Sequence, residues 1–397
     1  MAVDFPREAQ DIADELIALR RDLHRNPELG NHLPNTQARV LAALQNLPLE
    51  ITKGETLTSV VAVLRGALPG PTVLLRGDMD ALPVSEENDL EYASNNGCMH
   101  ACGHDLHTAG LVGAAKLLSA HRDELRGNVV FMFQPGEEGP GGAEPMINEG
   151  VLDAAGTRVD AAFGVHVMPG ERGTFTARPG TMLAGANIMR VVFHGAGGHG
   201  SQPENSLDPV PPLVEFCQAL QVMVTRRFSV FDPVVASITN LSAGEAINVI
   251  PPSASMGASV RTLSAETTRD FPIYARELAE SIATGHGCTA EIEWTNVYRP
   301  TVNDDAETAY LLRTLTHVFG ADRVVEADNP IMGSEDFSYV LEEVPGAFYM
   351  LQATPEGIDP ETAAVNHSPH VQFDDAVLAD QAASLATLAF AHNTLER

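Results

Sequence analysis

The stretch 98–107 holds three histidines, two cysteines and an aspartate within ten residues. Imidazole, thiolate and carboxylate groups at this density are typical ligands of a borderline-soft divalent metal ion. An apolar helical run follows directly, so the alternative is a helix start that happens to be rich in histidine. The residue types favour a metal site whose remaining ligands come from other parts of the chain.

Two adjacent carboxylates, Glu137 and Glu138, follow the apolar run 129–133 on a turn rich in glycine and proline. Neighbouring side chains point in different directions, so one carboxylate can bind a metal ion while the other faces its bound water. A metal ion lowers the pKa of such a water toward about 7, and a nearby carboxylate can then accept its proton. The alternative is an acidic, solvated turn.

Further candidates lie singly in the chain. His166 ends an apolar run and His367 lies in a loop before Ser368-Pro369, so each is either a ligand or a packed structural histidine. Asp78 and Asp80 alternate at the end of a strand-like run, where one of them can support a metal ligand from behind. Their alternative role is that of turn-forming aspartates.

A glycine-rich loop, 195–203, displays His199. Glycine permits close backbone approach, and the histidine can polarise a substrate carbonyl oxygen; a plain hairpin turn is the alternative. Asn248 and Arg261 are weaker candidates. An arginine suits a substrate carboxylate, although most strand arginines simply pair or extend to solvent.

Apolar strand-like runs alternate with helical ones over the first part of the chain, which predicts a mostly parallel, covered sheet. The acids and histidines follow the carboxyl ends of these strands, the edge at which open α/β sheets bind ligands. We predict a turn at 68–71. The predicted strands are 60–64, 72–75, 129–133 and 161–166, and the predicted helices are 7–25, 36–47, 105–120 and 143–150.

From about residue 187 the order changes to strand 188–193, helix 208–228, strands 234–240 and 255–262, helix 266–284 and strand 290–297. This is the β-α-β-β-α-β order of ferredoxin-like domains. We therefore predict an α/β fold in which a mostly parallel-sheet domain, 1–184 and 298–397, carries an inserted ferredoxin-like domain, 185–297.

The composition of the chain excludes some classes of function. The 397 residues carry a net charge of −29 with 44% hydrophobic residues, which describes an ordinary globular protein that repels nucleic acid and anionic membranes. The chain shows no apolar run of 18 residues and no signal-peptide pattern, and its four cysteines form no disulfide framework. These features predict a cytoplasmic protein that binds neither nucleic acid nor membranes.

A set of motifs, in order, resembles the di-metal amidohydrolases of the aminoacylase/carboxypeptidase superfamily, most closely the hippurate hydrolase and indole-acetyl-amino-acid hydrolase branch. The motifs are RGDMDALP (76–83), MHACGHDLH (99–107), FQPGEEG (133–139), GVH (164–166), GGHGSQP (197–203), NVIP (248–251), GSEDFS (333–338) and HSP (367–369).

The resemblance implies a catalytic domain with two divalent metal ions and an inserted lid that mediates dimerisation. It implies Glu137 as general base, Asp80 as the acid that orients a ligand, and Cys102 as a bridging thiolate. His199, Asn248 and Arg261 resemble lid residues that grip the substrate, in the site of a partner subunit. The implied metal ligands are Cys102, His104, Glu138, His166 and His367.

The chain departs from the wider superfamily at three positions. Asp78 stands where carboxypeptidase-like relatives have a ligand histidine, a role that His104 takes over in this branch. Gly136 stands where alanine is commoner, and Cys98 is an extra thiol beside the site. None of these departures removes a catalytic group, so the resemblance implies an active enzyme.

The expected reaction is hydrolysis of the amide bond of N-acyl amino acids to a carboxylate and a free amino acid. The mixed ligand types suit zinc, manganese, cobalt or nickel. A homodimer or higher homo-oligomer formed through the lid is expected by analogy. Two alternatives stay open: a dipeptidase or carboxypeptidase with the same machinery, and a non-catalytic metal-binding protein on the same fold.

Overall fold

The computed structural model describes residues 3–394, which divide into two compact units. Within this range, the first unit comprises the residues up to Met182, Val302–Asn329, and those from Tyr339 onward. The second unit comprises Leu183–Thr301 and Pro330–Ser338. Among the described residues, no helix is both long and apolar enough to cross a membrane.

The first unit is built on an eight-stranded sheet of order β1-β2-β4-β3-β5-β16-β6-β15. Its central strands β4, β3, β5 and β16 run parallel, while β1, β2 and the β16–β6 pair are antiparallel. The strands are β1 (Leu49–Lys53), β2 (Val60–Arg65), β3 (Leu68–Asp78), β4 (Arg126–Gln134), β5 (Ala161–Met168), β6 (Phe175–Ala177), β15 (Val324–Glu326) and β16 (Gly346–Gln352). The predicted α/β class with a mostly parallel central sheet is confirmed.

The predicted turn at 68–71 is wrong, because these residues begin β3. Leu68 pairs with Arg126 of β4, and the register shifts before Thr72 resumes regular pairing. Proline and glycine are tolerated at such an irregularity, where ladder hydrogen bonds are missing. Turn-forming residues therefore marked a bulged strand end rather than a reversal of the chain.

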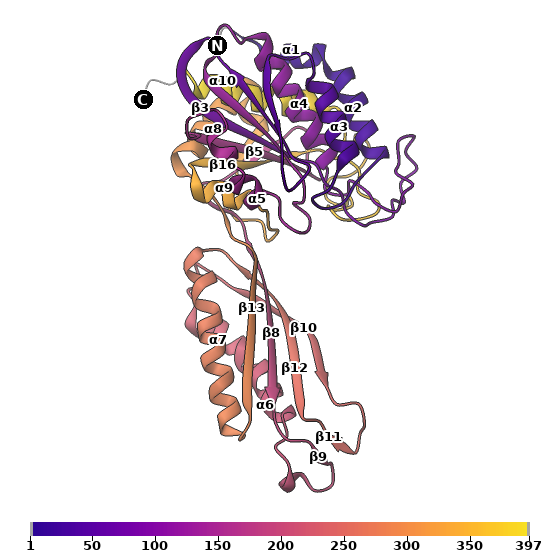
Figure 1. Cartoon of the computed structure of the whole chain (residues 1–397), viewed down its shortest axis with the longest axis vertical. Coiled ribbons are helices and arrows are strands. Elements are labelled where there is room, and N and C mark those ends of the chain that lie inside the picture. The colour runs from indigo at the N-terminus through magenta and orange to yellow at the C-terminus, as the bar shows by residue number, and fades with distance from the viewer. Residues whose placement is uncertain (1–2, 395–397) are drawn as a thin grey trace. The chain divides into compact units, whose positions relative to one another are not determined.

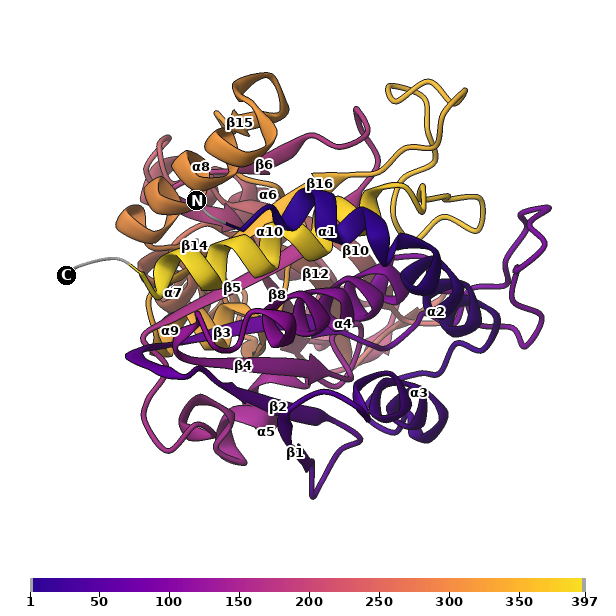
Figure 2. The same cartoon turned by 90° about the horizontal axis from the view of Figure 1, so that it is seen from above.

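Helices cover the sheet of the first unit, and α4 and α10 lie side by side against its central strands (Figure 2). The small residues of α4 permit this packing, since a Cβ at Gly113 would stand 2.6 Å from that of Ala382. The helices are α1 (Phe5–Asp11), α2 (Ala13–Arg25), α3 (Pro34–Leu44), α4 (His104–Ala120), α5 (Ala143–Asn148), α8 (Asp305–Phe319), α9 (Ser338–Glu343) and α10 (Val377–His392). The single helix predicted over 7–25 is two helices that meet at Ile12.

The second unit contains a four-stranded antiparallel sheet of order β10-β12-β8-β13. Figure 1 shows α6 and α7 along this sheet, where they share one apolar core with it. In chain order the elements are β8 (Gly185–His194), α6 (Val210–Arg227), β10 (Val235–Ala243), β12 (Ser253–Thr262), α7 (Ala265–Gly285) and β13 (Thr289–Tyr298).

Short elements complete the fold. In the second unit, β9 (Gly198–His199) pairs with β11 (Val249–Ile250). The other short elements are β7 (Gly180–Leu183), β14 (Thr301–Asn303) and the 3₁₀ turns Val151–Asp153, Pro203–Asn205 and Ala321–Arg323.

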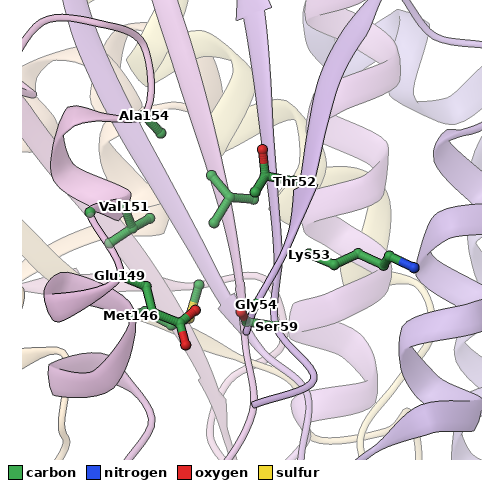
Figure 3. A pocket seen from close by; sticks show the side chains of 10 residues that line it. Thr52, Lys53, Gly54, Ser59, Met146, Glu149, Val151 and Ala154 are labelled. Carbon is green, nitrogen blue, oxygen red and sulfur yellow. The ribbon is translucent and has the colours of Figure 1, made fainter. Parts of the chain in front are cut away.

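A hollow of about 160 Å³ lies beside the edge strand β1 of the first unit (Figure 3). Met146 and Glu149 line it from α5 and the turn that follows, while Thr52 and Gly54 line it from the sheet side. None of its lining residues is a predicted metal ligand. The candidate metal centre lies elsewhere in the same unit.

Candidate metal centre

Parallel strands bring the candidate residues of the first unit to one edge of the sheet. Asp78 ends β3 and pairs with Gln134, the last residue of β4. His166 lies near the end of β5, which runs parallel to β3. His104 begins α4, directly after the cysteine- and histidine-rich stretch. The sheet register therefore gathers segments that are far apart in sequence.

The structure brings the five predicted ligands together around the Cys102 sulfur. Cys102 forms one group with His104 and His166 and a second with Glu138 and His367, with the ligand atoms of each group within 4.8 Å of one another. The sulfur lies 3.4 Å from His166 Nε2 and 3.3 Å from His367 Nε2. Cys102 is therefore the residue that the two groups share.

His367 has a strained backbone. Its φ of 72° makes it the sole non-glycine residue with positive φ among those described. Its N–H donates to the Ala101 carbonyl at 2.9 Å, which ties the loop to the stretch that carries Cys102. Left-handed conformations of this kind cost on the order of 1–3 kcal/mol and cluster at functional sites. The strain supports a role for this ring beyond packing.

The donor set fits a divalent cation. Both ring nitrogens of His104 and the Glu138 Oε1 atom are buried without an aligned hydrogen bond among the described residues. Burial and the neighbouring Glu138 carboxylate raise the pKa of the Cys102 thiol, so its thiolate needs a nearby cation. A bound metal ion would satisfy the thiolate, the Glu138 Oε1 atom and one ring nitrogen of His104, while Nδ1 of that ring faces Asp80 Oδ1 at 3.4 Å. Sulfur, nitrogen and oxygen donors together suit a borderline-soft ion.

Two of the predicted ligand histidines have pKa values that shift in opposite directions. Burial and the neighbouring His107 hold the pKa of His166 well below its usual value, which keeps its imidazole in the neutral form that binds metals. Burial opposes a charge on His104, but the carboxylates of Asp78 and Asp80 outweigh it and raise its pKa. A metal ion would therefore compete with a proton at His104.

Asp80 fixes the turn that carries the two glutamates. Its Oδ1 and Oδ2 atoms accept hydrogen bonds from the backbone N–H groups of Glu137 and Glu138, each at 3.0 Å. Oδ1 also lies 3.4 Å from His104 Nδ1. Gly136 begins this turn with φ of 79°, and a Cβ there would stand 1.8 Å from Asn31 Oδ1. An alanine there would strain the backbone at this positive φ and would displace the Asn31 side chain.

The lid candidates all lie in the second unit. His199 in β9 pairs with Val249 in β11, and the Gly200 N–H donates to the Asn248 carbonyl at 2.9 Å. Arg261 lies near the far end of β12, where it pairs with Ala186. It is eight residues beyond Ser253, or about 26 Å at 3.3 Å per residue. His199 and Asn248 are thus neighbours at the Ser253 end of the sheet, where the Gly195 N–H donates to the Pro252 carbonyl, and Arg261 lies at the opposite end of β12.

A buried charge cluster behind the site was missed in the sequence. Asp105 follows His104, and its Oδ2 lies 2.7 Å from both Arg20 Nε and His24 Nδ1. His24 Nε2 lies 3.2 Å from the Glu86 carboxylate. These contacts tie α2 to the first turn of the helix that carries His104. The sequence did offer one signal for this cluster. Arg20 and His24 fall on the buried stripe of α2, whose other residues are apolar.

His24 provides a test that depends on pH. Burial opposes its charge, but Asp105 and Glu86 outweigh burial and raise its pKa above 6.5. Its stabilising contribution is therefore fully present below about pH 6.5 and is lost as pH rises through the raised folded-state pKa. We expect His24→Gln to lower the unfolding free energy by about 3 kcal/mol at pH 5.5 and by less at pH 9.

Urea unfolding of the chelated protein at both pH values measures this difference. His317→Gln, at an exposed position of α8, is the matched control and should change neither value appreciably. An equal loss of stability for His24→Gln at the two pH values would mean that packing, rather than charge, carries the contribution of this ring.

Comparison with known proteins places these residues in a family context. The model of peptidase family M20/M25/M40 matches residues 74–391. The chain is 37% identical to thermostable carboxypeptidase 1 of Saccharolobus solfataricus, over 96% of each chain. It is 39% identical to the N-acyl-L-amino acid amidohydrolase of Geobacillus stearothermophilus, over 76% of this chain and 81% of the relative.

A solved structure extends the comparison. The Bacillus subtilis YXEP protein, described as a dinuclear metal-binding peptidase of the M20 family, superposes with a TM-score of 0.83 at 32% identity. The match covers 97% of this chain and 99% of that one. The likeness therefore spans both units of the chain.

Proposed function

Because the chain belongs to peptidase family M20/M25/M40, we propose that it is a metal-dependent amidohydrolase that cleaves N-acyl amino acids to a carboxylate and a free amino acid. The observation that carries the proposal is the convergence of four candidate metal-ligand side chains on Cys102, beside a further carboxylate, Glu137. The relative that acts, by its name, on N-acyl-L-amino acids supports the substrate class.

Five residues would hold two divalent ions: Cys102, His104, Glu138, His166 and His367. When bound, such ions lower the pKa of water and polarise the amide carbonyl. Zinc, manganese, cobalt and nickel all suit this mixture of donors. The dinuclear metal binding named for the Bacillus subtilis structure supports the count of two.

Glu137 is the proposed general base. Its carboxylate lies within the group formed with His104 and Glu138, and only 5% of the residue is exposed. It would accept a proton from the attacking water and then deliver that proton to the leaving amine. Asp80 would keep the carboxylate in place, because it holds the backbone of the same turn through two hydrogen bonds.

The second unit is proposed as a ferredoxin-like lid. Its element order and the sheet order β10-β12-β8-β13 are those expected for that fold.

His199 would stabilise charge on the carbonyl oxygen, while Asn248 and Arg261 would bind the amino-acid end. Since Arg261 is about 26 Å from the Ser253 end of its strand, one chain cannot bring all three to one small substrate. A homodimer, in which His199 and Asn248 serve the partner's site, would resolve this. Location in the cytoplasm stays a prediction.

A substrate screen after chelation tests the proposal. The protein is stripped of metal, then reloaded separately with zinc, manganese, cobalt or nickel. It is next assayed with N-acetyl and N-benzoyl amino acids beside dipeptides. We expect activity to fall at least about 100-fold on chelation and to return with at least one metal, with N-acyl amino acids as preferred substrates. Full activity in the stripped protein would contradict the metal-dependent reaction.

A peptidase is the second candidate, and it is favoured by the relative named as a carboxypeptidase. The same carboxylates and ligands would serve peptide hydrolysis, so the two functions differ only in the binding of the substrate. Dipeptides cleaved faster than N-acyl amino acids in the screen would select this candidate. Metal and substrate binding without turnover would instead indicate a non-catalytic protein.

A further inference from the structure

His107 is buried at the metal centre, yet the proposed reaction does not use it. Its Nε2 atom accepts a hydrogen bond from the Val167 N–H at 2.8 Å. Because an acceptor nitrogen carries no proton, the proton of this neutral ring must lie on Nδ1. Nδ1 lies 2.5 Å from the Asp78 Oδ1 atom and donates to it.

Asp78 is likewise engaged by groups of the protein. Its Oδ2 accepts from Arg76 Nη1 at 2.6 Å, and Arg76 Nε donates to Gln134 Oε1 at 2.9 Å. Arg76, Asp78 and His107 are each at most 1% exposed. The negative charge of Asp78 therefore already has a buried counter-charge.

Val167 connects these residues to a proposed ligand. Its carbonyl accepts from His166 Nδ1 at 2.7 Å and from Asn366 Nδ2 at 3.3 Å. With its proton on Nδ1, His166 has its lone pair on Nε2, the atom that faces the Cys102 sulfur. The Val167 N–H thus donates to His107, and the Val167 carbonyl accepts from His166. This one residue therefore links the two histidine rings.

We propose that Arg76, Asp78 and His107 form a buried brace that positions His166 through Val167, and that none of the three is a metal ligand. The inference rests on the proposed metal centre and adds positioning residues to it. Proximity alone allows another assignment, since Asp78, His104 and His107 also have ligand atoms within 4.8 Å of one another. The hydrogen bonds decide against that assignment, because both nitrogens of His107 are used by protein groups.

The experiment measures metal binding rather than turnover. Zinc binding to the chelated full-length chain is titrated against a competing chelator for wild type, Asp78→Asn and His107→Asn. Asparagine at 107 offers an amide donor to Asp78 but has no atom that reaches the Val167 N–H, so it tests that one contact. His392→Gln is the matched control, since His392 is also buried in the first unit, where it contacts Glu307. Thermal unfolding of each metal-free variant confirms that it folds.

A positioning role predicts unchanged stoichiometry and weaker affinity. Both variants should reach the wild-type ratio of zinc per subunit at saturation, with the dissociation constant raised about 10- to 100-fold. Cobalt-loaded variants should show a shifted thiolate-to-cobalt absorption band, because the ligands around Cys102 are displaced. His392→Gln should change neither quantity.

Two results would overturn the brace. A saturating ratio that falls by one zinc in Asp78→Asn would make Asp78 a ligand, and wild-type affinity in both variants would deny them any positioning role. If Asp78→Asn does not fold, His107→Asn decides on the same two criteria. If wild type itself binds neither zinc nor cobalt, the proposed metal centre is wrong, and the brace that rests on it is wrong as well. If wild type binds metal but hydrolyses no N-acyl amino acid, only the proposed substrate fails and the test of the brace stands.

Discussion

Replacing Glu137 with glutamine should lower kcat by about 10²–10⁴-fold while leaving the metal content unchanged. An amide has nearly the shape of a carboxylate but cannot accept the proton of the attacking water. The Asp80 hydrogen bonds go to backbone N–H groups, so the turn keeps its conformation in the variant. Measuring kcat on an N-acyl amino acid together with the metal-to-protein ratio checks both parts of this expectation.

The matched control for this variant is Glu144→Gln, which removes an exposed carboxylate from the first turn of α5, close by in sequence. Its kcat should equal that of wild type. Near wild-type turnover in Glu137→Gln would rule out this residue as the general base. Loss of metal in the same variant would instead make Glu137 a ligand.

Cys102→Ala should have the largest effect on metal binding. The sulfur is buried and lies within 3.4 Å of His166 Nε2 and 3.3 Å of His367 Nε2, so its removal affects both groups of ligands. We expect a lower saturating metal-to-protein ratio and a loss of kcat/KM greater than the 10- to 100-fold typical of a supporting residue. Elemental analysis after dialysis and steady-state kinetics give the two numbers.

Cys217→Ala is the control for Cys102→Ala, because Cys217 is a partly buried thiol on α6 of the second unit. It should retain both metal and activity. A full metal complement in Cys102→Ala would contradict a bridging thiolate and leave the histidines and Glu138 as the whole site. Taken with Glu137→Gln, this variant separates the binding of metal from the transfer of the proton.

The amino-acid sequence by itself determined the elements and the strand ends at which the chemistry lies. A strand that is buried on both faces needs a continuous apolar run, whatever its neighbours in the sheet. Runs such as 129–133 can therefore be recognised from the local sequence. Glu137 and Glu138 follow such a run, so their place at the sheet edge could be predicted. Local signals failed where packing overrode them, as at 68–71, where turn-forming residues begin a bulged strand.

Residue types alone did not separate the crowded histidines; the resemblance implied His104 as the ligand, and only the tertiary structure supplies a physical reason for that choice. His104 and His107 are separated by less than one helical turn, and residue type does not distinguish one from the other. His107 is bonded to Val167, which lies 60 residues away along the chain, while both nitrogens of His104 lack such a bond. Contacts of that range depend on sheet register and helix packing, which no local pattern of residues encodes.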